Sequence, residues 1–146
     1  MKRKIIKMKI ILASLYANPI HPGHIEYLYM SKNLGDKLIV IVNNDLQQKL
    51  KIGKVYQDQN FRLNIIKSIK PVDKVFLSID EDPSVCKSIE AIYNDQKYYH
   101  PEAEIIFAKG GDRFIGNIPE VEVCNRLGIN IVDGLGEKIH SSTEYR

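Results

Sequence analysis

The chain has 146 residues, of which 44% are hydrophobic and 27% are charged. This size and composition fit one compact domain with its own core, so residues 1–146 are predicted to form a single domain. The 21 basic and 18 acidic residues give a formal net charge of +3, which is too small and dispersed to predict a nucleic-acid groove. No apolar run reaches the length of a membrane span, so neither nucleic acid nor a membrane is expected as a partner.

The first twenty residues mix basic and apolar side chains, a pattern that signal peptides and buried strands share. Lys7 and Lys9 interrupt the apolar run, and the uninterrupted part, residues 10–15, is short for a signal-peptide core. We therefore interpret this segment as a first strand. Cys86 and Cys124 lie far apart, unlike the cysteines of a disulfide framework. Free thiols and a cytoplasmic location are expected.

Apolar segments of strand length alternate with amphipathic segments of helix length along the chain. Strands are predicted at residues 9–15, 38–42, 74–78, 104–108 and 129–132, each β-branched or almost entirely apolar. Helices are predicted at residues 23–34, 60–69, 83–93 and 119–127. Residues 47–59 are predicted to be a polar loop and a candidate lid. The alternation predicts an α/β fold with a Rossmann-like doubly wound, mainly parallel five-stranded sheet.

Two histidines bracket a turn between the first strand and the first helix, in the sequence His21-Pro22-Gly23-His24. Glycine permits a close backbone approach, and a helix start presents unpaired N–H groups that suit a phosphate. Imidazole donors aimed at phosphate oxygens would stabilise the charge that grows when phosphorus is attacked. The alternative is a turn cap and an exposed helix histidine. A zinc site is disfavoured, because no third ligand lies nearby in the sequence.

Two further turns carry groups that suit a nucleotide. After the fourth predicted strand, Gly110 and Gly111 let the backbone press against a base or sugar, and Asp112 can accept hydrogen bonds. An ordinary turn is the alternative. Near the end of the chain, hydroxyl groups and backbone N–H groups offer a second phosphate cradle, for which a frayed terminus is the alternative. The hydroxyl residues are Ser141, Ser142 and Thr143.

Basic side chains outside these turns are candidates for phosphate contacts. Arg62 and Arg146 can each present a forked pair of donors to phosphate oxygens. The predicted polar loop contains Lys49, Lys51 and Lys54, of which one can reach the triphosphate or the acceptor phosphate when the loop closes. Spacing alone does not choose between these lysines.

The segment LYANPIHPGHIEYL, residues 15–28, resembles the H-x-G-H signature of the cytidylyltransferase-like nucleotidylyltransferases. Further likenesses to that family follow in the same order along the chain. They are LGDKLIVIVNND at residues 34–45, Phe61-Arg62 ahead of the third predicted strand, AKGGDRF at residues 108–114 and HSSTEYR at residues 140–146. The resemblance implies a Rossmann-like fold and the transfer of a nucleoside monophosphate from a nucleoside triphosphate to a phosphorylated small molecule, with release of pyrophosphate.

The resemblance also implies roles for individual residues. The implied catalytic residues are His21, His24 and Arg62, with Lys49 and Lys51 as candidate contacts to phosphate or acceptor. The implied nucleotide-binding residues are Asn18, Pro19, Ile20, Gly23, Gly110, Gly111, Asp112, Ser141, Ser142, Thr143 and Arg146. The implied cofactor is Mg²⁺, held mainly by the substrate phosphates and not by protein ligands. Because family members are commonly dimers, a homodimer is expected.

The acceptor is chosen from the turn after the fourth predicted strand. Lys109-Gly110-Gly111-Asp112 is more similar to the heptose-1-phosphate-type adenylyltransferases of lipopolysaccharide core biosynthesis than to the glycerol-3-phosphate cytidylyltransferases. This likeness favours ATP over CTP, and a sugar phosphate as acceptor. A glycerol-3-phosphate cytidylyltransferase-like enzyme and an FAD synthetase-like enzyme stay open as alternatives, as does the adenylylation of pantetheine phosphate or nicotinamide mononucleotide. A non-catalytic module that binds or senses a nucleotide is the alternative from another functional class.

Overall fold

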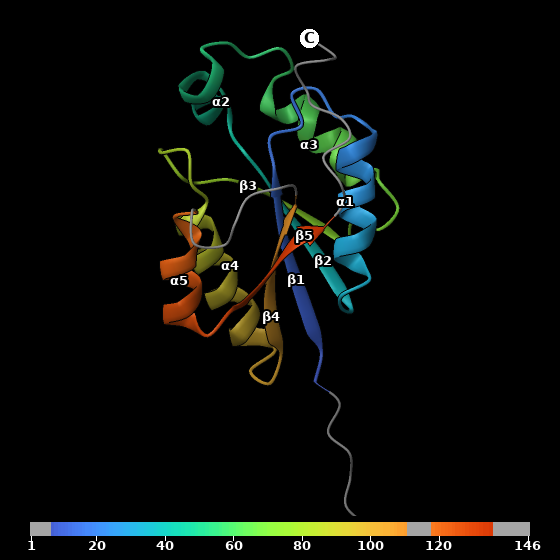
Figure 1. Ribbon diagram of the computed structural model, residues 1–146, viewed down its shortest axis with the longest axis vertical. Coiled ribbons are helices and arrows are strands. Elements are labelled where there is room, and N and C mark those ends of the chain that lie inside the picture. The colour runs from blue at the N-terminus through green and yellow to red at the C-terminus, as the bar shows by residue number, and fades with distance from the viewer. Residues whose placement is uncertain (1–6, 111–117, 136–146) are drawn as a thin grey trace, which may run out of the picture.

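The computed structural model of the protein describes residues 7–110 and 118–135 (Figure 1). Five strands form one sheet in the order β3-β2-β1-β4-β5, and every neighbouring pair is parallel. The strands are β1 (Lys9–Leu15), β2 (Lys37–Val42), β3 (Lys74–Leu77), β4 (Glu104–Gly110) and β5 (Asn130–Leu135). The predicted α/β, doubly wound fold is therefore confirmed, with a sheet that is parallel throughout the described residues.

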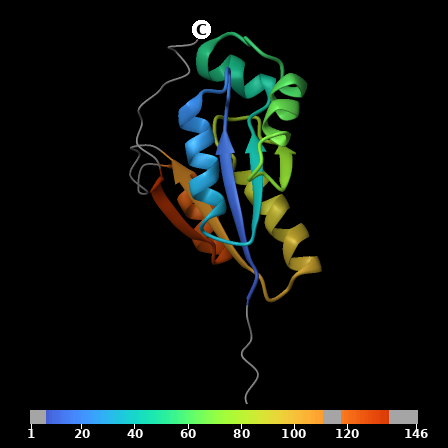
Figure 2. The same cartoon turned by 90° about the vertical axis from the view of Figure 1, so that its right-hand side faces the viewer.

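Helices cover both faces of the sheet (Figures 1 and 2). One face packs against α1 (Pro22–Lys32) and α3 (Gln59–Lys67), and the other against α4 (Cys86–Tyr99) and α5 (Glu120–Leu127). The remaining helix, α2 (Asp45–Ile52), lies beyond the carboxyl ends of the strands, at the top of Figure 1. Within the described residues no helix is long and apolar enough to cross a membrane.

The core forms two layers because successive strand residues point to opposite faces of the sheet. In β1, Ile10 and Leu12 pack toward α4 and α5, whereas Ile11 and Ala13 pack toward α1 and α3. All four side chains are fully buried. Burial on both faces explains why the strands read in the sequence as continuous apolar runs and not as alternating ones.

Helix α2 corrects the prediction of a polar loop over residues 47–59. Its sequence starts with a capping box, in which the side chain of Asn44 accepts from the backbone N–H of Gln47 and the Gln47 side chain accepts from the backbone N–H of Asn44. Gly53 ends the helix in the left-handed conformation, with φ of 74°. The loop prediction was wrong for residues 47–52, whereas residues 53–58 connect α2 to α3 without helix or strand. The helix was missed because its burial is reversed: the polar Gln47 is buried and the apolar Leu46 is exposed.

Helix α4 is shifted toward the C-terminus relative to the predicted range of residues 83–93. The hydroxyl of Ser84 accepts from the backbone N–H of Cys86 at 3.4 Å and donates to the carboxylate of Asp82. The buried carboxylate of Asp80 accepts from the next two backbone N–H groups, those of Lys87 and Ser88. A cap supplied from seven and eight residues away leaves no short-range signature in the sequence.

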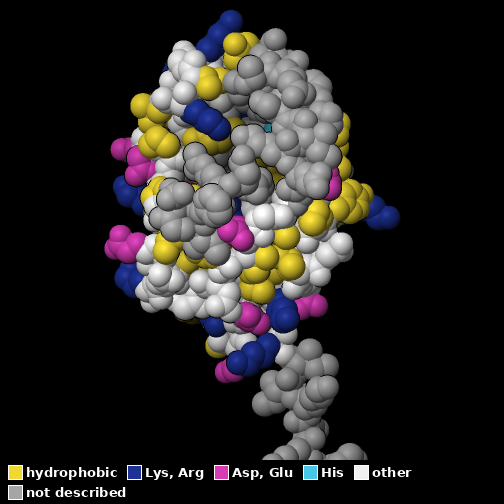
Figure 3. Space-filling view, viewed as in Figure 1, with side chains coloured by type: hydrophobic (Ala, Val, Ile, Leu, Met, Phe, Trp, Pro, Cys, Tyr) yellow, Lys and Arg dark blue, Asp and Glu magenta, His cyan; other side chains and the backbone are white. Residues whose placement is uncertain are grey.

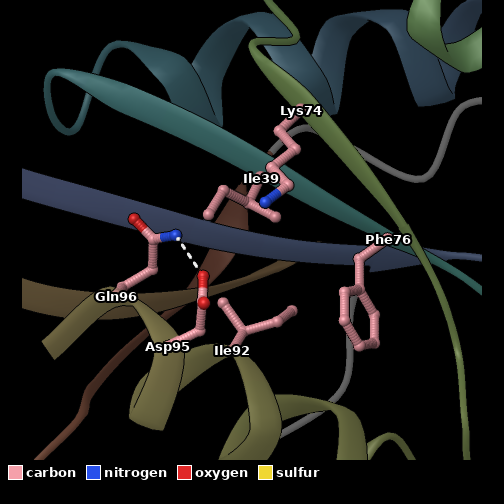
Figure 4. A pocket seen from close by; sticks show the side chains of 6 residues that line it. All are labelled: Ile39, Lys74, Phe76, Ile92, Asp95 and Gln96. Atoms are coloured by element: carbon pink, nitrogen blue, oxygen red, sulfur yellow. Dashed lines mark hydrogen bonds between the residues drawn. The ribbon is translucent and has the colours of Figure 1, made fainter. Parts of the chain in front are cut away.

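A cavity of about 200 Å³ lies between β3 and α4 (Figure 4). Lys74 begins β3 and Gln96 is near the end of α4, so the cavity lies toward the amino ends of the strands. Ligands of open parallel sheets bind at the opposite, carboxyl edge. The complete lining is Ile39, Lys74, Phe76, Ile92, Asp95 and Gln96.

Candidate active site

The two predicted catalytic histidines meet at the start of α1, directly beyond the carboxyl end of β1. Their rings stack with centroids 3.7 Å apart and planes inclined by 22°. His21 is the N-cap residue with extended backbone, and Pro22 takes the first helical position, where its missing N–H costs nothing. The sequence therefore folds locally so that both imidazoles lie together at the amino end of the helix.

Backbone hydrogen bonds fix the orientation of both rings. Nδ1 of His21 accepts from the N–H of Gly23 at 3.1 Å, and Nδ1 of His24 accepts from the N–H of His21 at 3.1 Å. A nitrogen that accepts carries no proton, so the proton of each neutral imidazole is on Nε2. The two histidines replace the Ser and Glu of an ordinary capping box and at the same time become Nε2 donors.

Burial lowers the pKa of His24 to about 3, with further contributions from His21 and from the ammonium group of Lys51. His24 is therefore neutral around pH 7, which agrees with its Nδ1 accepting a hydrogen bond. A neutral Nε2–H donor can stabilise growing negative charge without adding a fixed positive charge to the site.

The low pKa of His24 predicts how stability depends on pH. The unfolded chain binds a proton on this ring below about pH 6.5, whereas the folded chain does not until about pH 3. The free energy of unfolding is therefore expected to fall as the pH drops through this window, by at most about 1.4 kcal/mol per pH unit from this group. Urea unfolding between about pH 4 and 7 checks this. The His24→Gln variant should show a shallower slope, and an equal slope in both proteins would contradict the pKa.

Asn18 connects the loop before the histidines to α2 and to the segment between α2 and α3. Its side chain is fully buried, donates to Oε1 of Gln48 at 2.9 Å and accepts from the N–H of Gln57 at 2.8 Å. Pro19 and Ile20 continue the loop to His21 and are partly buried. Asn18 thus fixes the position of the loop that leads to His21.

Arg62 lies behind the same loop with its side chain fully buried. Its guanidinium donates to the backbone carbonyls of Tyr16, Asn43 and Gln57 and to the carboxylate of Asp45, over distances of 2.6 to 3.0 Å. Burial lowers its pKa, while Asp45 acts in the opposite direction. These contacts join the ends of β1 and β2 to α3. The predicted contact between Arg62 and phosphate stays a prediction.

The two candidate lysines differ in their relation to the histidines. Lys51 lies with Nζ 4.0 Å from the centre of the Tyr16 ring, and its charge contributes to the lowered pKa of His24. Lys51 is therefore on the same side of α2 as the histidine pair. Lys49 is exposed, and no described contact brings it to His21 or His24. The structure thus distinguishes Lys51, which acts on the histidine pair, from Lys49, a choice that spacing in the sequence could not make.

Gly110 ends β4 against the ring of Tyr27. A Cβ at this position would lie 2.9 Å from Cδ1 of Tyr27, so only glycine fits without displacing the ring. The remaining predicted nucleotide-binding residues lie outside the described part of the chain; they are Gly111, Asp112, Ser141, Ser142, Thr143 and Arg146.

Several residues that support the site escaped the sequence analysis. Gln48 and Tyr27 are both buried, and they hold Asn18 and the ends of β1 and β4 respectively. The one available signal was the position of Tyr27, one helical turn after His24 and hence on the same face of α1. Both thiols are free, and burial raises the pKa of Cys124 to about 12, so it is a poor nucleophile.

Comparison with known proteins gives relatives in sequence and in structure. The chain is 38% identical over 94 residues to a protein named FAD synthase from Thermoplasma acidophilum, and 36% identical over 88 residues to one from Ferroglobus placidus. Each match covers 60% of this chain, and they cover 66% and 56% of the respective relatives. The chain thus spans less than two thirds of the length of these curated relatives.

A solved structure, that of the lipopolysaccharide core biosynthesis protein from Thermoplasma volcanium, superimposes with a TM-score of 0.68 at 27% identity. The match covers 88% of this chain and 98% of that protein. The family model described as cytidylyltransferase-like matches residues 17–146, which include the histidine turn and all helices of the structure. The resemblance stated from the H-x-G-H segment is therefore confirmed, and the chain belongs to the cytidylyltransferase-like family.

Proposed function

We propose that this chain is a nucleotidylyltransferase that moves a nucleoside monophosphate from a nucleoside triphosphate to a phosphorylated small molecule. An oxygen of the acceptor phosphate attacks the α-phosphorus, the bond to the oxygen bridging the α- and β-phosphates breaks, and pyrophosphate leaves with that electron pair. The observation that carries the proposal is the stacked pair His21 and His24, with both Nδ1 atoms accepting backbone N–H groups at a helix start.

The proposed catalysis consists of positioning and charge stabilisation. Nε2–H of His24 and of His21 donate to phosphate oxygens, and the N–H groups at the start of α1 add the positive end of the helix dipole. Lys51 supplies a positive charge on the side of α2, whereas Arg62 keeps the loop before His21 in place. Family resemblance alone assigns the remaining residues to nucleotide contacts; they are Gly110, Gly111, Asp112, Ser141, Ser142, Thr143 and Arg146.

Mg²⁺ is proposed as the cofactor, held mainly by phosphate oxygens. The described donors around the histidine turn are imidazoles, amides and an ammonium group, and no three metal-ligating side chains gather within residues 7–110 and 118–135. Such a donor set fits a magnesium ion that arrives on the triphosphate, since Mg²⁺ prefers oxygen ligands. When bound, the ion would neutralise charge on the phosphates.

For the acceptor we favour flavin mononucleotide with ATP as the donor. FAD contains an AMP unit joined to flavin mononucleotide, and the relatives named FAD synthase support this choice. A sugar phosphate is the second candidate, supported by the likeness of Lys109-Gly110-Gly111-Asp112 and by the similarity to the lipopolysaccharide core biosynthesis protein. The surface in Figure 3 carries basic and acidic side chains interspersed, which suits a small-molecule partner better than nucleic acid. A homodimer and a cytoplasmic location are also proposed.

Pyrophosphate release tests this function. The purified chain is incubated with Mg²⁺ and either ATP or CTP, each combined with flavin mononucleotide, a heptose 1-phosphate or glycerol 3-phosphate. Release is expected with ATP and flavin mononucleotide, and the dinucleotide product should appear in equal amount by mass spectrometry. Release only with a heptose phosphate would favour the second candidate. Tight triphosphate binding with no release for any acceptor would instead identify a nucleotide-binding or sensing module.

A further inference from the structure

Strands β1 and β4 separate at their carboxyl ends although both continue. Their pairing runs from Lys9 and Glu104 to Ala13 and Ala108. Beyond that point β1 stays paired with β2 as far as Leu15, and β4 continues to Gly110. The gap therefore opens on one side of β1 only, between β1 and its neighbour β4.

The hydroxyl of Tyr27 fills this gap. It accepts from the backbone N–H of Ser14 at 3.2 Å and donates to the backbone carbonyl of Ala108 at 2.6 Å. A side chain from α1 thus takes the place of a direct main-chain bond between the two strands. Tyr27 is 7% exposed, and burial raises its pKa far above the usual range, so the hydroxyl keeps the proton that it donates.

The gap lies at the switch point of the sheet. After β1 the chain turns into α1 on one face, and after β4 it leads to α5 on the other face. Open parallel sheets bind their ligands in the crevice at such a point. The ring of Tyr27 also supports Gly110, whose position leaves room for no Cβ. One side chain therefore contacts the ends of both strands and the glycine that follows β4, one turn along α1 from His24.

We propose that Tyr27 is a positioning residue of the triphosphate site. Its hydroxyl bridges the separated carboxyl ends of β1 and β4, and its ring sets the distance between the histidine turn and Gly110. The identity of the bound molecule rests on the proposed function. Phenylalanine keeps the ring but leaves the N–H of Ser14 and the carbonyl of Ala108 without their partner, so the ends of the strands should shift.

The test compares Tyr27→Phe with Tyr29→Phe, a matched change on the exposed face of the same helix, where Tyr29 is 45% exposed. Titration calorimetry measures the Kd for ATP with Mg²⁺. Tyr27→Phe is expected to raise the Kd at least about tenfold, and Tyr29→Phe to leave it unchanged. A lower melting temperature with an unchanged Kd in Tyr27→Phe would overturn the proposal.

A second readout needs no nucleotide. Amide hydrogen exchange by NMR should accelerate at Ser14 in Tyr27→Phe, with no change at Ser14 in Tyr29→Phe. If the wild-type chain binds no triphosphate, the proposed function fails, while the exchange of Ser14 still decides whether the hydroxyl of Tyr27 joins the strands. Unchanged exchange at Ser14 in Tyr27→Phe would overturn the bridging role directly.

Discussion

Replacing Arg62 by methionine is expected to lower the free energy of unfolding by about 3–5 kcal/mol. The substitution keeps an unbranched apolar stem of similar length but removes every donor. The backbone carbonyls of Asn43 and Gln57 would lose the hydrogen bonds from this side chain, the carbonyl of Tyr16 would keep only the longer contact from Gln48, and the carboxylate of Asp45 would lose its ion pair. Leaving a buried acceptor without a hydrogen bond costs more free energy than the net stabilisation that the bond contributes. Urea unfolding followed by circular dichroism measures the difference.

Arg126→Met is the matched control. Arg126 donates twice to Glu90, but both side chains are about half exposed and the pair lies on the surface of α4 and α5. Exposed pairs of this kind contribute about 0–1 kcal/mol. Arg62→Lys should fall between the wild type and Arg62→Met, because one ammonium group cannot reach four acceptors at once. A loss below about 1 kcal/mol in Arg62→Met would show that the buried guanidinium does not hold the loop.

His24→Gln is expected to reduce kcat/KM for pyrophosphate release by about a hundredfold to a thousandfold. Glutamine is the usual partner at this position of a capping box, so it can still accept the N–H of His21 and keep the helix start in place. The variant thus removes the Nε2 donor while retaining the local fold. Steady-state kinetics with the acceptor that supports turnover gives the value, and the melting temperature confirms that the chain is folded.

The control for this substitution is His100→Gln, at the exposed end of α4 and far along the chain from the turn. It should leave kcat/KM at the wild-type value. A His24→Gln enzyme with wild-type kinetics would remove His24 from the mechanism. If His24→Gln loses both its activity and its melting transition, the lost activity reflects a disrupted helix start. His24→Asn, which keeps a shorter amide acceptor, would then separate the loss of the Nε2 donor from the loss of local structure.

The bounds of β1, β2 and β3 were predictable to within one residue, whereas β4 and β5 continue beyond their predicted ends at residues 108 and 132. The helices were less predictable. A parallel strand covered on both faces is a continuous apolar run, and such a run is unambiguous in residues 38–42 and 104–108. Helix α2 was not predictable in this way, because Leu46 and Leu50 face solvent while Gln47 and Gln48 are buried. Periodicity identifies a helix only when its apolar face is the buried one. In α4, only Gln96 is buried after residue 93, so no apolar pattern extended the prediction to Tyr99.

The site was predictable where chemistry depends on neighbours in the sequence. His21 and His24 are three residues apart at a helix start, and local geometry alone brings their rings together. Arg62 illustrates the opposite case, since the residues that surround it come from the ends of β1 and β2 and from the loop before α3. Only the fold reveals that its donors face the protein. For the same reason the role of Tyr27 could not be predicted beyond its place one turn after His24, because its two partners lie on strands 13 and 81 residues away.

The reversed burial of α2 has a thermodynamic consequence. Gln47 and Gln48 attach this helix through amide contacts to Tyr16, Asn18, Asp82 and Ser84, whereas Leu46 and Leu50 already meet water. Detaching α2 would therefore expose little additional apolar surface to water. We therefore expect opening of this kind to have a small heat-capacity change and a small denaturant dependence, while the two core layers stay intact.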